Sequence, residues 1–207
     1  LLTDAVGGKG YRQIDINLGC PFPMIAGKHK GAGMLLYPAQ VAEVLAPIAE
    51  YPEIQFSLKM RLGWENASEC MVLVELLNAL RLSRIALHAR TGKQQYKGHP
   101  DLEAFQGFYE LCQHPLYYNG GIESLSDIRQ ILIRFPLLKG VFIGRGLLSS
   151  PLLAKEFKGN ETFLPEQRMS IYFAFHEELF SAYSQVLQGE TQLLVKMKTL
   201  WEYFLPE

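Results

Sequence analysis

The residue types most suited to chemistry lie at the ends of apolar runs, and Cys20 is the first of them. It follows the run Arg12–Asn17, which has the composition of a buried strand. The chain has 3 cysteines, an odd number without paired spacing, the others being Cys70 and Cys112. This pattern argues against a disulfide framework and against a zinc site. We therefore expect Cys20 to be a reactive thiol and expect no metal.

Polar side chains and glycines recur at the ends of the other apolar runs. One such residue is weak evidence, because a lone lysine is usually exposed and a lone histidine is usually hydrogen-bonded in a core. In a (β/α) barrel, however, the carboxyl ends of the strands converge on one face, so residues distant in sequence meet there. The strand-end residues are Asn17, Lys59, Arg61, His88, Arg90, Asn119, Gly120, Gly121, Gly144, Arg145 and Gly146.

The glycines in the last two of these groups precede predicted helices. Exposed backbone amides at the start of a helix favour anions, and Arg145 can add a charge-assisted contact. Tight turns would explain Gly120 and Gly144 but not the arginine. The pattern therefore favours a ligand with a phosphate group.

Strands and helices alternate along the first three quarters of the chain, which favours a parallel sheet covered by helices. The predicted strands are Arg12–Asn17, Ile54–Met60, Arg84–His88, Leu116–Asn119 and Gly140–Ile143. The predicted helices between them are Pro38–Glu50, Ala67–Arg81, Leu102–Cys112 and Ser124–Arg134. We predict an α/β fold, a (β/α)8 TIM barrel that lacks about its first three strands, with the tail of a helix at Leu1. A small open sheet is the alternative.

The composition changes after Gly146, where only helical patterns follow. These are a helix over Leu147–Lys158 and long helices from Pro165 and from Glu190. We predict a partial barrel domain over residues 1–160 and an incomplete helical domain over residues 161–207.

The net charge of -1 gives no global basic excess, which a nucleic-acid binder usually shows. Any such surface must be local, and solvated faces would explain the same residues. Candidates are Lys28–Lys30, the group Arg90, Lys93 and Lys97, and the pair Lys196 and Lys198. No segment has the length and apolarity of a membrane span, so we expect a cytoplasmic protein without a membrane partner.

Five segments, in order, resemble the tRNA-dihydrouridine synthase family. The chain is thereby identified as an apparently N-terminally truncated member, and the matching segments run through most of residues 11–158. They are Asp15–Pro21 with Gly31–Leu36, Leu58–Gly63, His88–Thr91 with Gln94–Gly98, Asn119–Ile122 and Ile143–Gly146.

This resemblance implies an FMN-dependent oxidoreductase that reduces selected uridines of tRNA to 5,6-dihydrouridine, with NADPH as the reductant. It implies that Cys20 is the proton donor, which suits a thiol with an ordinary pKa of ~8.5. The implied FMN contacts are Lys59, His88, Asn119, Gly120, Gly121, Gly144 and Arg145. The implied substrate contacts are Asn17 and Arg61 near the flavin or base, Arg90 and Tyr96 where tRNA enters, and Lys196 and Lys198 on phosphates.

Two alternatives remain open at this point. One is an FMN-dependent barrel oxidoreductase that acts on a small pyrimidine-like substrate. The segment His88–Thr91 and the helical tail distinguish the tRNA enzyme from this alternative, because enzymes acting on a small substrate need neither feature. The other is a catalytically inactive fragment that at most binds RNA.

Overall fold

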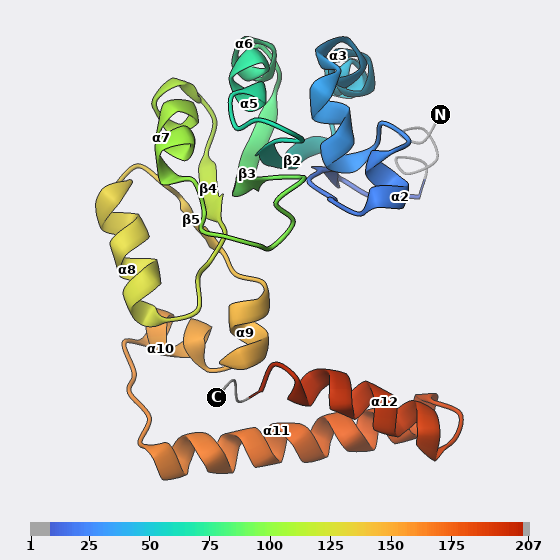
Figure 1. Ribbon diagram of the computed structural model, residues 1–207, viewed down its shortest axis with the longest axis vertical. Helices are drawn as coiled ribbons and strands as arrows, with labels where there is room; N and C mark the ends of the chain where they lie inside the picture. The colour runs from blue at the N-terminus through green and yellow to red at the C-terminus, as the bar shows by residue number, and fades with distance from the viewer. Residues whose placement is uncertain (1–8, 205–207) are drawn as a thin grey trace. The chain divides into compact units, whose positions relative to one another are not determined.

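A computed structural model describes residues 9–204 of the chain (Figure 1). The helix tail predicted at Leu1 lies outside the described residues. The chain forms two compact units, which are described separately below. The first comprises the residues up to Gly121 together with Gln130–Phe142, and the second comprises Ile122–Arg129 with the residues from Ile143 onward.

The first unit contains a parallel sheet of 5 strands in the order β1-β2-β3-β4-β5, which confirms the predicted α/β class. The strands are β1 (Gln13–Leu18), β2 (Gln55–Gly63), β3 (Leu82–Thr91), β4 (Leu116–Asn119) and β5 (Gly140–Phe142). Each strand pairs with the next strand along the chain. All carboxyl ends therefore lie at the same edge of the sheet.

Side chains alternate between an apolar and a polar face of this sheet. On the apolar face, Leu58 and Met60 of β2 and Ile85 and Leu87 of β3 are buried. Helices cover this side of the sheet in Figure 1, and aromatic rings fill the core beneath α7 (Leu102–Leu111). The rings of Tyr118 and Phe135 each contact that of Phe105 edge-on, at 5.0 Å between centroids.

Several helices differ from the sequence prediction. The predicted helix over Pro38–Glu50 is two helices, because Pro47 has no amide hydrogen to continue the first. Pro151 separates α9 from α10 in the same way, and the helix predicted over residues 67–81 is broken at Leu73. The observed helices are α2 (Pro23–Ala26), the 3-10 helix η1 (Gly31–Leu36), α3 (Pro38–Leu45), α4 (Pro47–Glu50), α5 (Glu69–Val72), α6 (Val74–Asn78), α8 (Leu125–Arg134), α9 (Arg145–Ser149) and α10 (Leu153–Gly159).

β2 and β3 each extend three residues beyond their predicted ends. β2 continues to Gly63 and β3 to Thr91, so Lys59 and His88 lie within strands rather than at their ends. The register between β2 and β3 shifts after Arg61, which pairs with His88 while Gly63 pairs with Thr91. The polar residues at this end of the two strands are themselves buried, namely Arg61, His88, Arg90 and Thr91.

In the second unit, α11 (Pro165–Val186) and α12 (Glu190–Trp201) pack against each other. The side chain of Arg168 on α11 forms an ion pair with Glu156 of α10, whose carboxylate is buried. Aromatic residues join the two long helices, since the rings of His176 and Trp201 lie 5.4 Å apart. Among residues 9–204, no helix is long and apolar enough to cross a bilayer.

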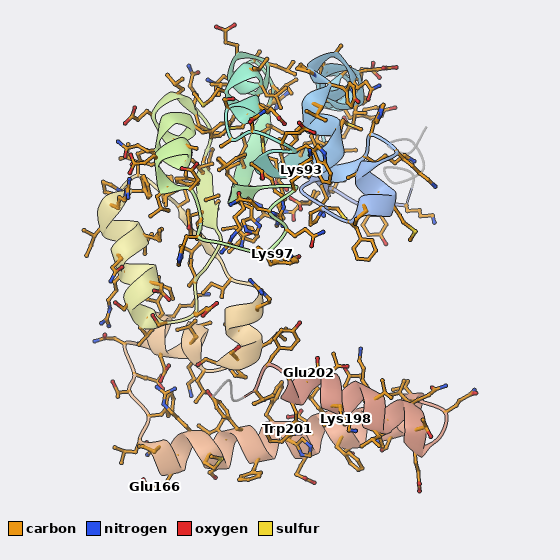
Figure 2. All side chains as sticks on the ribbon, viewed as in Figure 1. Lys93, Lys97, Glu166, Lys198, Trp201 and Glu202 are labelled. Carbon is orange, nitrogen blue, oxygen red and sulfur yellow. The ribbon has the colours of Figure 1, made fainter. Side chains whose placement is uncertain are left out.

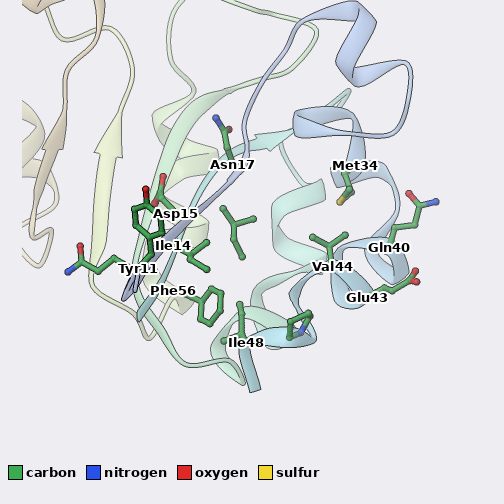
Figure 3. A pocket seen from close by; sticks show the side chains of 13 residues that line it. Tyr11, Ile14, Asp15, Asn17, Met34, Gln40, Glu43, Val44, Ile48 and Phe56 are labelled. Atoms are coloured by element: carbon green, nitrogen blue, oxygen red, sulfur yellow. The ribbon is translucent and has the colours of Figure 1, made fainter. Parts of the chain in front are cut away.

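The apolar face of the sheet is less completely covered beside β1. A cavity of about 980 Å³ lies there, between β1 and the helices α3 and α4. Figure 3 shows Ile14, Val44, Ile48 and Phe56 lining it, with Asp15 and Asn17 at one side. Among the described residues, β1 pairs with β2 alone. The free edge of β1 and this apolar cavity therefore adjoin each other.

The turn after β2 predicts a difference between two glycine substitutions. A Cβ on Gly63 would lie 2.1 Å from the carbonyl oxygen of Asn66, whereas one on Gly107, within α7, would come no closer than 3.8 Å to Met71. Gly63→Ala is expected to destabilise the protein by about 1–3 kcal/mol through overpacking. Gly107→Ala is expected to stabilise it by about 0.5–1 kcal/mol, because alanine favours helix. Urea unfolding of both variants measures these effects, and equal midpoints would contradict them.

Candidate active site

Cys20 lies in a turn that leaves β1, and contacts with this strand and with η1 hold the turn. The amide of Gly19 donates to Oδ1 of Asn17 at 2.9 Å, and the amide of Ala32 donates to the carbonyl oxygen of Cys20 at 3.0 Å. Gly31 has φ of +56°, and a Cβ there would lie 2.7 Å from the Cys20 oxygen, so only glycine fits. The Cys20 turn, Asn17–Pro21, is thus held by its own strand and by η1, and the thiol is half-buried.

Lys59 lies beside this turn on the polar face of the sheet, paired in register with Asn17. A Cβ on Gly19 would lie 3.6 Å from Nζ of Lys59 and 3.4 Å from Oδ1 of Asn17, so the glycine permits this close approach. Burial lowers the pKa of Lys59, the charge of Arg61 lowers it further, and Asp15 partly offsets both effects. Among the described residues, no carboxylate lies within 4.0 Å of the ammonium. The site thus holds a partly desolvated cation.

Arg61 and Arg90 lie behind the loop that begins at the last residue of β3 and comprises residues Thr91–Gly98. Arg61 donates from Nη1 to the carbonyl oxygens of Thr91 and Gln95, at 2.8 and 2.7 Å. Arg90 donates from Nε and Nη2 to the carbonyl oxygen of Gly98, at 3.2 and 2.9 Å. Both guanidinium groups are buried, with exposed fractions of 1% and 5%. They hold the Thr91–Gly98 loop from inside.

His88 connects this loop with the end of β4. Its Nε2 lies 3.2 Å from Nη1 of Arg90, and its ring centroid lies 6.4 Å from that of Tyr96. A Cβ on Gly120 would lie 3.2 Å from the imidazole ring, and one on Gly121 would lie 3.7 Å from Nη2 of Arg90. Gly120 and Gly121 have φ of +133° and +61°, so the turn needs glycine at both positions.

The first unit thereby brings most of the predicted site residues together. Contacts run from the Cys20 turn through Arg61, Tyr96 and His88 to the glycines after β4. Asn119 is at the end of β4, where its amide donates to the carbonyl oxygen of Phe142 at 2.8 Å. The residues in this cluster are Asn17, Cys20, Lys59, Arg61, His88, Arg90, Tyr96, Asn119, Gly120 and Gly121.

The remaining predicted residues belong to the second unit. Gly144 and Arg145 are exposed at the start of α9, and a Cβ on Gly144 would meet no atom within 4 Å. Lys196 and Lys198 are exposed on α12, where Nζ of Lys196 lies 5.6 Å from the ring centroid of Tyr183. Figure 2 shows Lys198 and Trp201 on this helix, and Lys93 and Lys97 on the Thr91–Gly98 loop of the first unit. The roles of these residues stay predictions.

The sequence reasoning missed the residues that support the site through their backbone. Gln95 has φ of +51° and its carbonyl oxygen accepts from Arg61, yet its side chain gives no sign of this role. Gly31 and Ala32 also escaped notice as supports of Cys20. The segment Gly31–Gly33 does carry a signal, since two glycines flanking one alanine are typical of close backbone approach. In the described part of the chain, no group of three metal-ligating side chains is found.

The family assignment follows from comparison with known proteins. A profile described as "Dihydrouridine synthase (Dus)" matches residues 3–204, nearly the whole chain. The chain belongs to the dihydrouridine synthase family. The resemblance predicted from the five sequence segments is therefore confirmed.

Curated relatives within this family carry more specific names. The chain is 32% identical over 143 residues to the probable tRNA-dihydrouridine synthase of Rhizobium leguminosarum bv. phaseoli, covering 69% of this chain and 45% of that protein. It is 36% identical over 149 residues to the probable tRNA-dihydrouridine synthase of Aquifex aeolicus, with coverages of 70% and 46%. It is 27% identical over 161 residues to tRNA-dihydrouridine synthase B of Vibrio vulnificus, covering 76% of this chain and 50% of that protein. The chain spans about half the length of these relatives.

The three thiols of this dihydrouridine synthase family member are expected to differ in reactivity. Burial raises the pKa of the Cys70 thiol to about 12 and raises that of Cys112, whereas Cys20 is half-exposed at the edge of the sheet. Only the thiolate reacts with iodoacetamide. At pH 8, Cys20 is expected to be alkylated at least tenfold faster than Cys70, as measured by peptide mass spectrometry. Faster labelling of Cys70 than of Cys20 in the folded protein would contradict the predicted difference in reactivity.

Proposed function

We propose that the protein to which this chain belongs reduces specific uridines in tRNA to 5,6-dihydrouridine, with FMN reduced by NADPH. The observation that carries the proposal is the polar cluster at the carboxyl end of the sheet, where a half-buried thiol and a partly desolvated lysine lie together in a dihydrouridine synthase family member. The relatives named as tRNA-dihydrouridine synthases support the choice of tRNA as substrate.

The residues of the first unit fit a flavin. A reduced flavin is anionic, and Lys59 offers it an ammonium that is partly desolvated and has no carboxylate within 4.0 Å among the described residues. Such a cation gains more from a new anionic partner than a fully hydrated lysine would. His88 and the glycine pair Gly120–Gly121 adjoin one another at the same edge. We propose Lys59, His88, Asn119, Gly120 and Gly121 as flavin contacts.

FMN, when bound and reduced by NADPH, supplies the hydride that C6 of uracil receives. Cys20 holds the proton for C5 on Sγ, and its S–H bond breaks as the new C–H bond forms. The resulting thiolate regains a proton from water, so the residue is unchanged after each cycle. Asn17 and the backbone around Gly31 keep the thiol in place while this occurs. The target base must first leave its stack in the tRNA.

We also propose that the sheet is the second part of a (β/α)8 barrel, in which about three further strands would precede β1. The five parallel strands in chain order are those of a barrel segment. The free edge of β1 and the adjoining cavity of about 980 Å³, lined by Ile14 and Phe56, would receive a preceding strand and helix. The boundary between barrel and helical domains, predicted at residues 160 and 161, is part of this proposal.

The second unit carries the rest of the proposed contacts. We propose that Gly144 and Arg145 hold the flavin phosphate, since glycine leaves the backbone amides open and arginine can bind phosphate through two hydrogen bonds. Lys196 and Lys198 are exposed cations suited to tRNA phosphates. Arg90 and Tyr96 remain the proposed residues of the tRNA entrance, the buried Arg90 acting by holding the loop that carries the exposed Tyr96.

Replacing the proposed proton donor tests the mechanism. Cys20→Ala is expected to lower dihydrouridine formation at least a hundredfold, because no other thiol of the described first unit is exposed at this edge, while FMN absorbance near ~450 nm persists. Liquid chromatography and mass spectrometry of tRNA nucleosides measure the product. Cys112→Ala, at the other end of the sheet, is the control and should retain activity. Near-normal dihydrouridine with Cys20→Ala would refute the assignment.

Replacing the half-buried Lys59 is expected to have opposite effects on FMN binding and on stability. Lys59→Met should lower FMN retention at least tenfold, and Lys139→Met, at an exposed lysine before β5, should not. Because burial lowers the pKa of Lys59, its charge disfavours folding below that pKa, and this cost is relieved as pH rises toward the ordinary value of 10.5.

The flavin-free Lys59→Met protein should therefore be more stable than the parent at pH 7, by roughly 2 °C in Tm, with a smaller difference at high pH. Thermal melts between neutral and alkaline pH, together with FMN titrations, measure both effects. Unchanged FMN affinity would remove Lys59 from the proposed flavin site.

A further inference from the structure

Arg61 is a fully buried charge without a carboxylate partner. Its side chain is 1% exposed, and no carboxylate of the described residues lies within 4.0 Å of it. Burial lowers its pKa, although the phenol of Tyr96 and the nearby Cys20 thiol act in the opposite direction. Burying a guanidinium is costly unless its donors are satisfied. The fold offsets this cost by satisfying the donors of Arg61 with backbone carbonyl oxygens.

The contacts of Arg61 reach two different segments. Its Nε donates to the carbonyl oxygen of Gly19 at 3.0 Å, one peptide bond before Cys20. Its Nη1 donates to the carbonyl oxygens of Thr91 and Gln95, in the Thr91–Gly98 loop. The planar guanidinium has donors on several sides, so a single group can bind both segments at once. A lysine ammonium on a similar stem cannot reproduce this arrangement.

The loop side of this contact is held in an unfavourable conformation. Gln95 has φ of +51°, a region that side chains other than glycine rarely adopt. The next residue, Tyr96, places its ring centroid 5.5 Å from Cζ of Arg61 and is itself 53% exposed. The bond from Arg61 to the Gln95 carbonyl therefore fixes the direction in which the Tyr96 ring projects.

We infer that Arg61 is a positioning residue that couples the Cys20 turn to the Thr91–Gly98 loop. It sets the orientation of the thiol and of the exposed Tyr96 ring together, so a conformational change in either segment alters the conformation of the other. The inference rests on the proposed function only for its catalytic consequence, since the coupling itself is a property of the fold. Arg61 acts from behind the two segments, because its Nε and Nη1 donate to their carbonyl oxygens.

The test uses Arg61→Lys, which keeps the charge but removes the planar set of donors. Amide hydrogen exchange is expected to rise at least fivefold both in residues 92–98 and at residues 19 and 20. The rate of Cys20 alkylation is expected to rise at least threefold, and kcat for uridine reduction to fall at least tenfold with bound FMN per chain unchanged. Arg84→Lys is the matched control: Arg84 is on the polar face of β3, half-exposed near Asp15, and should show none of these changes.

A second variant probes the coupling from the loop. Tyr96→Leu removes a half-exposed ring and its contact with the guanidinium, and the variant is expected to fold even where Arg61→Lys does not. Coupling predicts faster exchange at residues 19 and 20 and at least twofold faster alkylation of Cys20. Unchanged exchange and alkylation at the Cys20 turn in this variant, or loosening confined to one segment in Arg61→Lys, would overturn the inference. Exchange and alkylation decide the coupling even if the parent protein forms no dihydrouridine.

Discussion

The parallel register between β1, β2 and β3 is the constraint on which the site depends. Asn17 pairs with Lys59, and Arg61 pairs with His88, so residues from three separate parts of the sequence face the same side at the same edge. A slip of one residue in any strand would turn these side chains toward the helices. The apolar residues between them, such as Met60 and Leu87, oppose such a slip because it would expose them. The core thus enforces the alignment that the polar cluster needs.

Burying the charges of the polar cluster is unfavourable, and hydrogen bonds with the backbone offset much of this free energy. Arg61 and Arg90 direct their donors to carbonyl oxygens of the Thr91–Gly98 loop, and Glu69 accepts hydrogen bonds from the amides of Trp64, Glu65 and Asn66 after β2. Two loops without regular structure thereby gain hydrogen bonds from buried or acidic side chains. This leaves Lys59 as a cation whose charge is available to a ligand.

Much of this arrangement could be predicted from the sequence, because strand periodicity and the order of strands together imply which residues share an edge. Cys20, Lys59 and His88 were recognised in this way, and the family comparison supports the assignment of the chain. The extent of β2 and β3 could not be predicted, since Arg61 and Arg90 do not have the composition of a buried strand. Their burial depends on carbonyl oxygens supplied by a distant loop, and sequence patterns do not reveal such contacts. The helices predicted through Pro47 and Pro151 were wrong, although the lack of an amide hydrogen at proline was visible in the sequence.

The free edge of β1 also has a consequence for how the protein fares inside a cell. Among the described residues, no strand pairs with the outer side of β1, where Ile14 and Ile16 are half-exposed. A strand edge of this kind attracts other extended chains unless it is covered. Chaperones and proteases recognise the same kind of surface. The strand and helix that we propose to precede β1 would therefore protect the protein from aggregation and proteolysis as well as close the sheet.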